Sequence, residues 1–346
     1  MPLQFETFNT IIESHKRFVL TSHVNPDGDG LGSEVALAHY LESRGKQVSI
    51  LNCSATPENY LFLHQLHPIL QFDPLHHEDI VENAEVIILL DANDPDRLAA
   101  MTPFIMKSDA VKVCIDHHPE PGEFADLYLL DEQSPATGEI IYNFISMSGS
   151  PKFFERLPAK GTQAGRRAGG TIDHITATAL YTAIMTDTGS FRYQKTDSEV
   201  HTIVAHLLQA GADPVAIYEQ VYEHTSAKRM RLLGMALANM QLMYDGKLAY
   251  IVLTRDMFEA TGTTEEDTDA FVPYTLTIDG VQIGLMFTEM DNVIKINFRS
   301  KGDIAINGLA KEFGGNGHKN AAGARLSNAK LDEIVSLVLK YAGKYV

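Results

Sequence analysis

The sequence predicts an α/β fold, with an N-terminal mostly parallel sheet flanked by helices, a helical connector and a smaller C-terminal α/β domain. From residue 1 to about 190, short aliphatic runs alternate with helical patterns, which is typical of βαβ units. Residues from about 196 to 243 have helical patterns throughout, and β-type runs return only at 248–253. We therefore expect an N-terminal domain over residues 1–195, a connector over 196–243 and a C-terminal domain over 244–346.

In the N-terminal domain, the apolar runs mark the strands and the 3.6-residue periodicity marks the helices. Strands are expected at residues 18–23, 48–52, 85–90 and 111–115, and helices at 31–41, 137–145 and 175–187. The segment Gly161–Gly170 is glycine-rich and basic and has no hydrophobic period. It predicts either a surface loop or a flap that contacts phosphate.

The second half of the chain begins with three expected helices, at residues 200–209, 214–222 and 227–243. A strand at 248–253 follows, and then a hairpin whose strands, 284–289 and 293–298, are joined across Asp291 and Asn292. A short helix at 306–313 precedes a glycine-rich segment, residues 314–323, which we interpret as a loop.

Composition limits the classes of function. The formal net charge of -17 argues against binding to long nucleic acid, which needs a basic surface for counterion release. It does not exclude a small phosphorylated substrate, because bound divalent cations would reverse the local charge. The two cysteines are too few for a disulfide framework and indicate a reducing compartment. No signal-peptide pattern or long apolar run is present, so we expect a cytoplasmic protein that does not contact a membrane.

Carboxylates and imidazoles follow the ends of several predicted strands and helices. Because parallel strands end at one edge of a sheet, these side chains are expected to meet in one crevice. They suit Mg²⁺, Mn²⁺ or Zn²⁺, and their mutual repulsion requires cations. Two divalent ions that share a carboxylate would satisfy this requirement. The residues are His23, Asp27, Asp29, Asp91, Asp116, His117, His118 and Asp187.

These residues carry a resemblance to a known family. The segments 23–29, 116–118 and 186–192, together with Asp91, resemble the four motifs of the DHH phosphoesterase superfamily. Residues 314–323 are similar to the glycine-rich signature of the DHH-associated C-terminal domain. In size and layout the chain resembles the group of bifunctional oligoribonucleases and pAp phosphatases (nanoRNase type), where pAp is adenosine 3′,5′-bisphosphate.

The resemblance implies a division of labour among the metal ligands. One ion would be held by His23, Asp27 and Asp91. A second would be held by Asp29, His117 and Asp187, with Asp91 bridging the two. The resemblance makes His118 a hydrogen-bond donor or general acid beside the scissile phosphate and Asp116 a group that orients an imidazole. Mn²⁺ is the ion that the family implies, while the ligand set also accepts Mg²⁺, Co²⁺ or Zn²⁺.

The resemblance further implies that the C-terminal domain holds the substrate while the N-terminal domain cuts it, with the active site in the cleft between them. Glycines in the segment 314–323 would let backbone N–H groups approach an anion closely. Our candidates for substrate binding are Arg299, His318, Gly315, Gly317, Asn320 and, in the N-terminal domain, Arg192.

The resulting hypothesis is a metal-dependent phosphoesterase that converts short oligoribonucleotides to mononucleotides and dephosphorylates pAp, through attack of hydroxide on phosphorus. Other members of the superfamily remain alternatives: a phosphodiesterase for cyclic or linear dinucleotides, a single-strand exonuclease or a pyrophosphatase. A non-catalytic nucleotide-binding module is a third class, which the complete ligand set disfavours. Short RNA and pAp are the expected partners, and a homodimer is an open alternative to a monomer.

Overall fold

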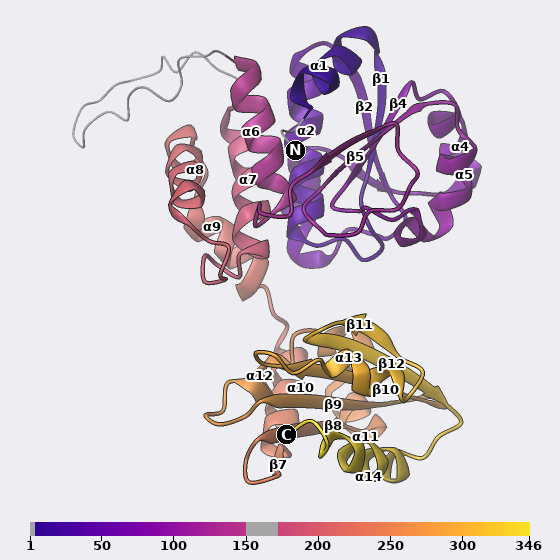
Figure 1. The fold of residues 1–346 in the computed structure, drawn as a ribbon, viewed down its shortest axis with the longest axis vertical. Helices are drawn as coiled ribbons and strands as arrows, with labels where there is room; N and C mark the ends of the chain where they lie inside the picture. Colours follow the sequence, from indigo (N-terminus) through magenta and orange to yellow (C-terminus); the bar gives the residue numbers. More distant parts are fainter. Residues whose placement is uncertain (1–3, 150–171) are drawn as a thin grey trace, which may run out of the picture. The chain divides into compact units, whose positions relative to one another are not determined.

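The computed structural model describes residues 4–149 and 172–346, and it divides the chain into two compact units, residues 1–224 and 225–346 (Figure 1). The segment Gly161–Gly170, for which we predicted a loop or flap, lies outside the described residues. Among the residues that are described, no helix combines the length and apolar character needed to cross a membrane. We describe each unit separately.

The first unit contains a six-stranded parallel sheet with the strand order β3-β2-β1-β4-β5-β6. The order reverses direction between the central strands β1 and β4, and in such sheets ligands bind in the crevice beyond the carboxyl ends at this switch point. The strands are β1 (Arg17–Thr21), β2 (Gln47–Asn52), β3 (Ile69–Gln71), β4 (Val86–Leu90), β5 (Val111–Asp116) and β6 (Leu127–Leu130).

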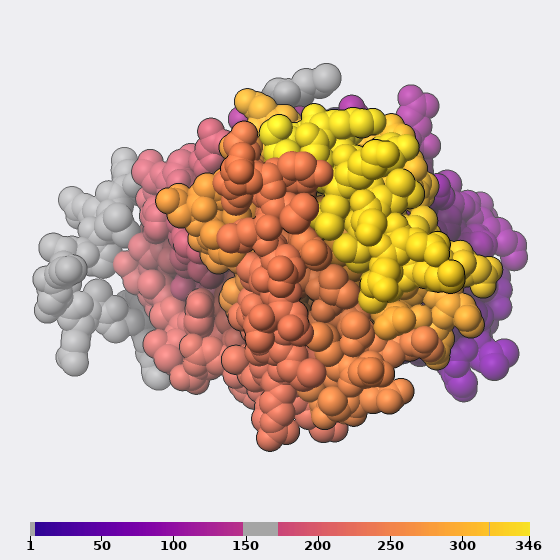
Figure 2. All heavy atoms as spheres, turned by 90° about the horizontal axis from the view of Figure 1, so that it is seen from below, coloured from indigo at the N-terminus to yellow at the C-terminus, as the bar shows by residue number. Residues whose placement is uncertain are grey.

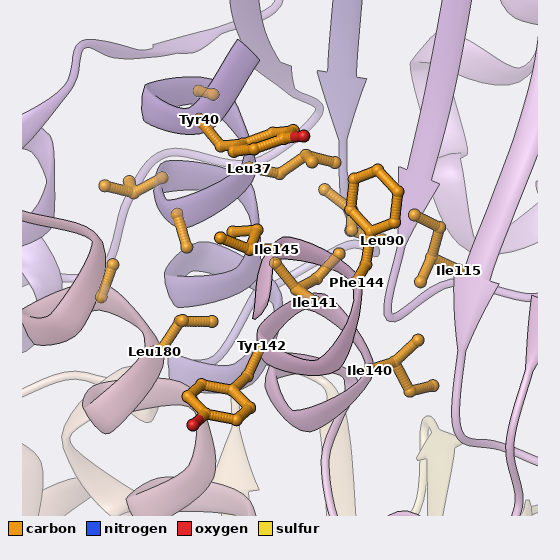
Figure 3. Close-up of a cluster of buried hydrophobic side chains, with 14 of the residues drawn as sticks. Leu37, Tyr40, Leu90, Ile115, Ile140, Ile141, Tyr142, Phe144, Ile145 and Leu180 are labelled. Atoms are coloured by element: carbon orange, nitrogen blue, oxygen red, sulfur yellow. The ribbon is translucent and has the colours of Figure 1, made fainter. Parts of the chain in front are cut away.

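Helices cover both faces of this sheet, which explains why its central strands are almost wholly apolar. All five residues of β4 are buried. Val86, Ile88 and Leu90 join one hydrophobic core, whereas Ile87 and Leu89 join the core on the opposite face. The first core is packed by α1 (Phe5–Ser14), α2 (Gly28–Ser43), α6 (Thr137–Gly149) and α7 (His174–Asp187) (Figure 3). The second is packed by α4 (Pro74–Glu82), the 3-10 helix η2 (Pro95–Met101) and α5 (Thr102–Lys107).

The helices of the expected connector are shared between the two units. Residues from α8 (Ser198–Ala210), α9 (Pro214–Tyr218) and the π-helical turn η4 (Glu219–Glu223) are buried in the first unit's core. Residues of α10 (Ala227–Ala238) are buried in a core of the second unit instead. The division between units therefore falls at His224 and Thr225. Two short elements of the first unit, η1 (Glu58–Tyr60) and α3 (Leu61–Leu66), complete its helices among the described residues.

The second unit contains a mixed six-stranded sheet with the order β11-β12-β10-β9-β8-β7, in which only β8 and β9 pair in parallel. Its last helix, α14, lies at the surface of this unit (Figure 2). The strands are β7 (Gln241–Met243), β8 (Leu248–Leu253), β9 (Ile283–Met290), β10 (Val293–Ser300), β11 (Asn316–His318) and β12 (Ala321–Ser327). The helices that follow α10 are α11 (Arg255–Thr261), η5 (Glu265–Thr268), α12 (Pro273–Leu276), α13 (Ile306–Lys311) and α14 (Leu331–Ala342).

The hairpin across Asp291 and Asn292 is confirmed, because β9 and β10 pair antiparallel with Met290 opposite Val293. Two other expectations were wrong. The helix expected over 227–243 ends at Ala238, because residues 241–243 form the edge strand β7, which a turn at residues 244–246 returns to β8. The glycine-rich segment 314–323 is not a loop, since most of it forms the paired strands β11 and β12.

Candidate active site

The start of α2 carries two of the predicted metal ligands. Asp27 is the N-cap residue, and its Oδ1 accepts hydrogen bonds from the backbone N–H groups of Asp29 (2.9 Å) and Gly30 (3.3 Å). Asp29 is fully buried, and its two carboxylate oxygens accept from the backbone N–H groups of Thr137 (2.7 Å) and Gly138 (2.9 Å). Asp29 therefore lies where the positive ends of two helices, α2 and α6, meet, which fixes an anionic group there.

Asp91 follows β4 and has three imidazoles around its carboxylate. Its backbone adopts a left-handed conformation, with φ of 56°, a conformation that is uncommon outside glycine and that turns the side chain away from the strand direction. Its Oδ2 lies 3.3 Å from His23 Nε2, and its Oδ1 lies 3.7 Å from His117 Nε2 and 3.3 Å from His118 Nδ1. Asp91, which follows β4, is thus the common neighbour of imidazoles that follow β1 and β5.

The ring of His117 is held through one nitrogen and directs the other toward carboxylates. Its Nδ1 lies 3.2 Å from the carbonyl oxygen of Ser134, so the Nδ1–H donates there and Nε2 keeps a free lone pair. Nε2 is buried and has no hydrogen-bond partner among the described residues. It nevertheless faces carboxylate oxygens of Asp187 (3.2 Å), Asp91 (3.7 Å) and Asp29 (3.8 Å). An unprotonated nitrogen surrounded by carboxylates is the arrangement that a divalent cation completes.

His118 has a different environment, which favours the protonated ring. Asp116 is fully buried, and its Oδ1 accepts from the N–H groups of His117 (2.6 Å) and His118 (3.0 Å) and from His118 Nδ1 (2.8 Å). Hydrogen bonds with Asp116 and then Asp91 raise the pKa of His118 to about 10. The His118 side chain is one-third exposed, so a protonated donor is accessible to a substrate.

The carboxyl groups of the site have pKa values that are shifted in opposite directions. Burial alone would raise the pKa of Asp91, but hydrogen bonds and attraction from His118 and His23 outweigh it and hold that pKa below its ordinary value. Burial, and then the negative charges of Asp91 and other carboxylates, raise the pKa of Asp29 well above its ordinary value and that of Asp187 to about 7. Without cations, some of these carboxyl groups hold protons at neutral pH.

The residues present fit divalent metal ions. Three groups of side chains each bring one ligand atom per residue within 4.8 Å of the others: His23, Asp27 and Asp91; Asp29, His117 and Asp187; and Asp91, Asp116, His117 and His118. The orphaned His117 Nε2 and the predominance of carboxylates agree with that chemistry. All eight residues for which the sequence predicted a metal or catalytic role therefore lie in one cluster, which we call the Asp91 cluster.

Sequence reasoning missed several groups that support this cluster. Thr137 and Gly138 supply the N–H groups that hold Asp29, and Asn93 donates to the carbonyl of His118 at 3.3 Å. Asn52 accepts from the N–H of Ser22, next to His23, at 2.8 Å. The helix start at Thr137 was visible in the sequence, but the pattern does not show which side chain its free N–H groups face.

The substrate-binding candidates lie in places that differ in kind. Arg299, on β10, is half-buried and donates to its neighbour's carbonyl, that of Phe298, at 3.0 Å. Asn320 donates to Ser300 Oγ (2.9 Å) and to the carbonyls of Gly302 (3.1 Å) and Ile304 (3.2 Å), so its amide holds the turn after β10. Arg192 is exposed, just beyond Asp187, and its Nε donates to Gly189 at 2.8 Å.

Gly315, just before β11, and Gly317, within it, have a packing explanation. A Cβ at Gly315 would lie 2.3 Å from the carbonyl oxygen of Gly323, and one at Gly317 would lie 2.5 Å from that of Ala321. Both glycines are needed for close contact between β11 and β12 whether or not an anion binds. The side chain of His318 lies outside the described part of the chain.

Comparison with known proteins identifies the class to which this fold and site belong. Residues 17–184 match the N-terminal domain of the DHH family, and residues 245–344 match the DHHA1 domain. The chain is a phosphoesterase, a hydrolase of phosphate esters. It belongs to the DHH family.

Its relatives match over nearly the whole chain. The bifunctional oligoribonuclease and PAP phosphatase NrnA of Thermus thermophilus is 27% identical over 326 residues, 93% of this chain and 87% of the relative. The NrnA of Bacillus subtilis is 27% identical over 315 residues, 91% of each chain. The crystal structure of an exopolyphosphatase-related protein from Bacteroides fragilis has a TM-score of 0.89 at 31% identity, and covers 99% of this chain and 96% of that one.

Proposed function

We propose that the chain hydrolyses very short oligoribonucleotides and removes a phosphate from pAp, with two divalent ions in the cluster around Asp91. The observation that carries the proposal is Asp91, whose Oδ2 lies 3.3 Å from His23 Nε2 and whose Oδ1 lies 3.7 Å from His117 Nε2, so that it faces one member of each proposed ligand set. A carboxylate shared between two ions is the feature that lets a two-metal site clamp a phosphate. The substrate class is supported by relatives that are named bifunctional oligoribonuclease and PAP phosphatase.

The chain's own residues have distinct roles in this proposal. His23, Asp27 and Asp91 would hold one ion, and Asp29, Asp91, His117 and Asp187 the other. Such ions supply Lewis acidity and lower the pKa of a water molecule, and Mn²⁺ is our first choice. The backbone N–H groups of Thr137 and Gly138 keep Asp29 in place.

His118 is the proposed proton donor. Its Nδ1 is occupied by Asp116 and lies beside Asp91, so the other ring nitrogen is the one that would face a phosphate or leaving-group oxygen. Asp116 accepts from both neighbouring backbone N–H groups as well, which fixes the orientation of the His118 ring. His118→Gln would keep a hydrogen-bond donor but could not transfer a proton. This variant therefore separates hydrogen bonding from acid catalysis.

Charge favours a short substrate. With a formal net charge of -17, the protein holds a polyanion only where cations outweigh the surrounding field. Beyond a few phosphates the substrate would meet acidic surface, which the screening length of about 8 Å at physiological salt only partly hides. We therefore expect kcat/KM to fall as RNA lengthens from two to about ten nucleotides.

One parallel assay tests this proposal. The purified chain with Mn²⁺ is given pAp, RNA of two, five and thirty nucleotides, cyclic dinucleotides, pyrophosphate and inorganic polyphosphate. Turnover of pAp and of the RNA dimer with the highest kcat/KM would support the proposal. Equal kcat/KM on the five-mer and thirty-mer would favour a processive exonuclease, and preferred turnover of a cyclic dinucleotide or of polyphosphate would replace the substrate class.

A further inference from the structure

A strained turn follows the proposed ligand Asp187. Three consecutive residues, Gly189, Ser190 and Phe191, have positive φ angles of 56°, 58° and 64°. Outside glycine this conformation is costly and persists only where the surrounding structure enforces it. Here Thr188 Oγ1 accepts the N–H of Phe191 at 3.0 Å, and the Phe191 ring packs against Tyr181 with centroids 5.8 Å apart. Strain held in this way clusters at ligand-binding sites.

The turn presents an arginine and a tyrosine to solvent. Tyr193 is 60% exposed, and its ring lies over Gly189 so closely that a Cβ there would be 2.4 Å from the ring. Arg192 is also exposed, and among the described residues it has no carboxylate partner. The glycine is thus required for the position of the Tyr193 ring.

Two more tyrosines lie beside this turn. Tyr218 and Tyr222 are 43% and 42% exposed, with ring centroids 4.8 Å apart. Tyr222 belongs to η4, a single π-helical turn, and such turns often occur at functional sites. Its hydroxyl lies within hydrogen-bonding reach of Ser190, in the strained turn, and the charge of Arg192 is near enough to influence it. We call Tyr193, Tyr218 and Tyr222 the tyrosine patch.

A series of contacts connects the residues beside the proposed metal ligands with η4, which carries Tyr222. A Cβ at Gly28 would lie 2.5 Å from Thr186 Oγ1, so the residues next to Asp27 and Asp187 are in contact. Tyr60 lies within hydrogen-bonding reach of Gly28 and near Tyr222. Asn59 in turn donates to the carbonyl of Val221, beside Tyr222, at 3.2 Å. These contacts link η4, which carries Tyr222, to the start of α2, which Asp27 caps.

We infer that the tyrosine patch is a stacking platform for a nucleobase of the substrate whose phosphate is held at the Asp91 cluster. Exposed aromatic rings near an exposed arginine are groups with which proteins hold unpaired bases, because every base offers a π face. This inference rests on the function proposed above and adds a base-binding subsite within the first unit.

The test compares a substrate that has a base with one that lacks it. Tyr193→Ala and Tyr222→Ala should raise the KM for pAp about tenfold or more, since stacking on one ring typically contributes that much. The KM for ribose 3,5-bisphosphate, which has no base, should change less than twofold. The variants Tyr193→Phe and Tyr222→Phe keep the ring and should restore the low KM. Tyr274→Ala removes a tyrosine that is 45% exposed in the second unit and serves as the matched control.

Several results would overturn the inference. They are an unchanged KM for pAp in both alanine variants, an equal rise for ribose 3,5-bisphosphate, or a changed oligomeric state by light scattering, which would assign the patch to a second copy of the chain. If the wild type hydrolyses neither substrate, the proposed activity fails. Binding is then measured by fluorescence quenching of 2-aminopurine riboside 3′,5′-bisphosphate. The alanine variants should bind it at least fivefold more weakly than the wild type, and equal binding would refute the platform.

Discussion

Two regions stand out in the sequence: the Asp91 cluster of the first unit and the glycine-rich segment 314–323 of the second, which forms β11 and the start of β12. They differ in whether their polar side chains find hydrogen-bond partners within the fold. In the cluster, the buried atoms His117 Nε2 and Asp116 Oδ2 have no partner among the described residues. In the segment 314–323, the Asn320 amide donates to three acceptors, and Lys319 pairs with Asp303 at 2.8 Å.

The difference shows how a binding residue can be told from a structural one. A buried polar atom without a partner is costly unless a ligand completes it, so the cluster implies a cation. An amide whose donors are already used inside the fold has little left for a substrate. By this criterion Arg299, whose side chain donates only to a neighbouring carbonyl among the residues that the structure describes, is the better candidate in the second unit.

The largest expected effect is at Asp91. Asp91→Asn should lower kcat/KM for pAp at least a thousandfold, about 4 kcal/mol of barrier, because it removes the carboxylate that two ions would share. Asp94→Asn is the matched control, since Asp94 is exposed and caps η2 through an acceptor oxygen that asparagine retains. A residual rate of Asp91→Asn within tenfold of wild type would show that Asp91 does not bridge.

A smaller effect separates the two candidates in the second unit. Asn320→Ala should lower the free energy of unfolding by about 1–3 kcal/mol, because acceptors in the turn after β10 lose their donor, with little change in KM. Arg299→Ala should raise the KM for pAp with the free energy of unfolding almost unchanged. Denaturant titration and steady-state kinetics measure both. If Asn320→Ala instead raised KM while keeping stability, its amide would be contacting substrate.

The smallest effect concerns pH and metal. In the metal-free protein, burial raises the pKa of Asp187 to about 7 and that of Glu34 to about 8. The folded state then holds protons that the unfolded state has released, so stability falls as pH rises through this window. His118, with its pKa raised to about 10, acts in the same direction.

We expect the Tm of the metal-free protein to be a few degrees lower at pH 8.5 than at pH 6.5, and Mn²⁺ to remove most of that difference. Differential scanning calorimetry with and without chelator measures this. A metal-free Tm that rises with pH would mean that the carboxylates are ionised at little cost. The cluster would then not need cations.

Much of the first unit follows from its sequence because the signals are local. The runs that form β1, β4 and β5 are mostly apolar, and candidate ligands follow each of them. The three-residue strands β3 and β7 give no such signal, and β7 was wrongly included in a helix although the Asp245-Gly246 turn follows it.

What the sequence could not supply is contact between distant residues. Nothing near Asp29 in the chain indicates that the N–H groups of Thr137 and Gly138 hold it. Likewise, only the fold brings Tyr222 within hydrogen-bonding reach of Ser190. Gly315 and Gly317 matched an anion-binding signature in the sequence. Their close packing against β12 is visible only once β11 and β12 are paired.

The count of bound metal ions tests the central claim most directly. Metal-free protein is dialysed against saturating Mn²⁺, and the ions per chain are measured by inductively coupled plasma mass spectrometry for wild type, Asp91→Asn and Arg299→Ala. The account predicts two ions in the wild type and in Arg299→Ala, and fewer than one in Asp91→Asn. Two ions retained in Asp91→Asn, or one or none in the wild type, would contradict it.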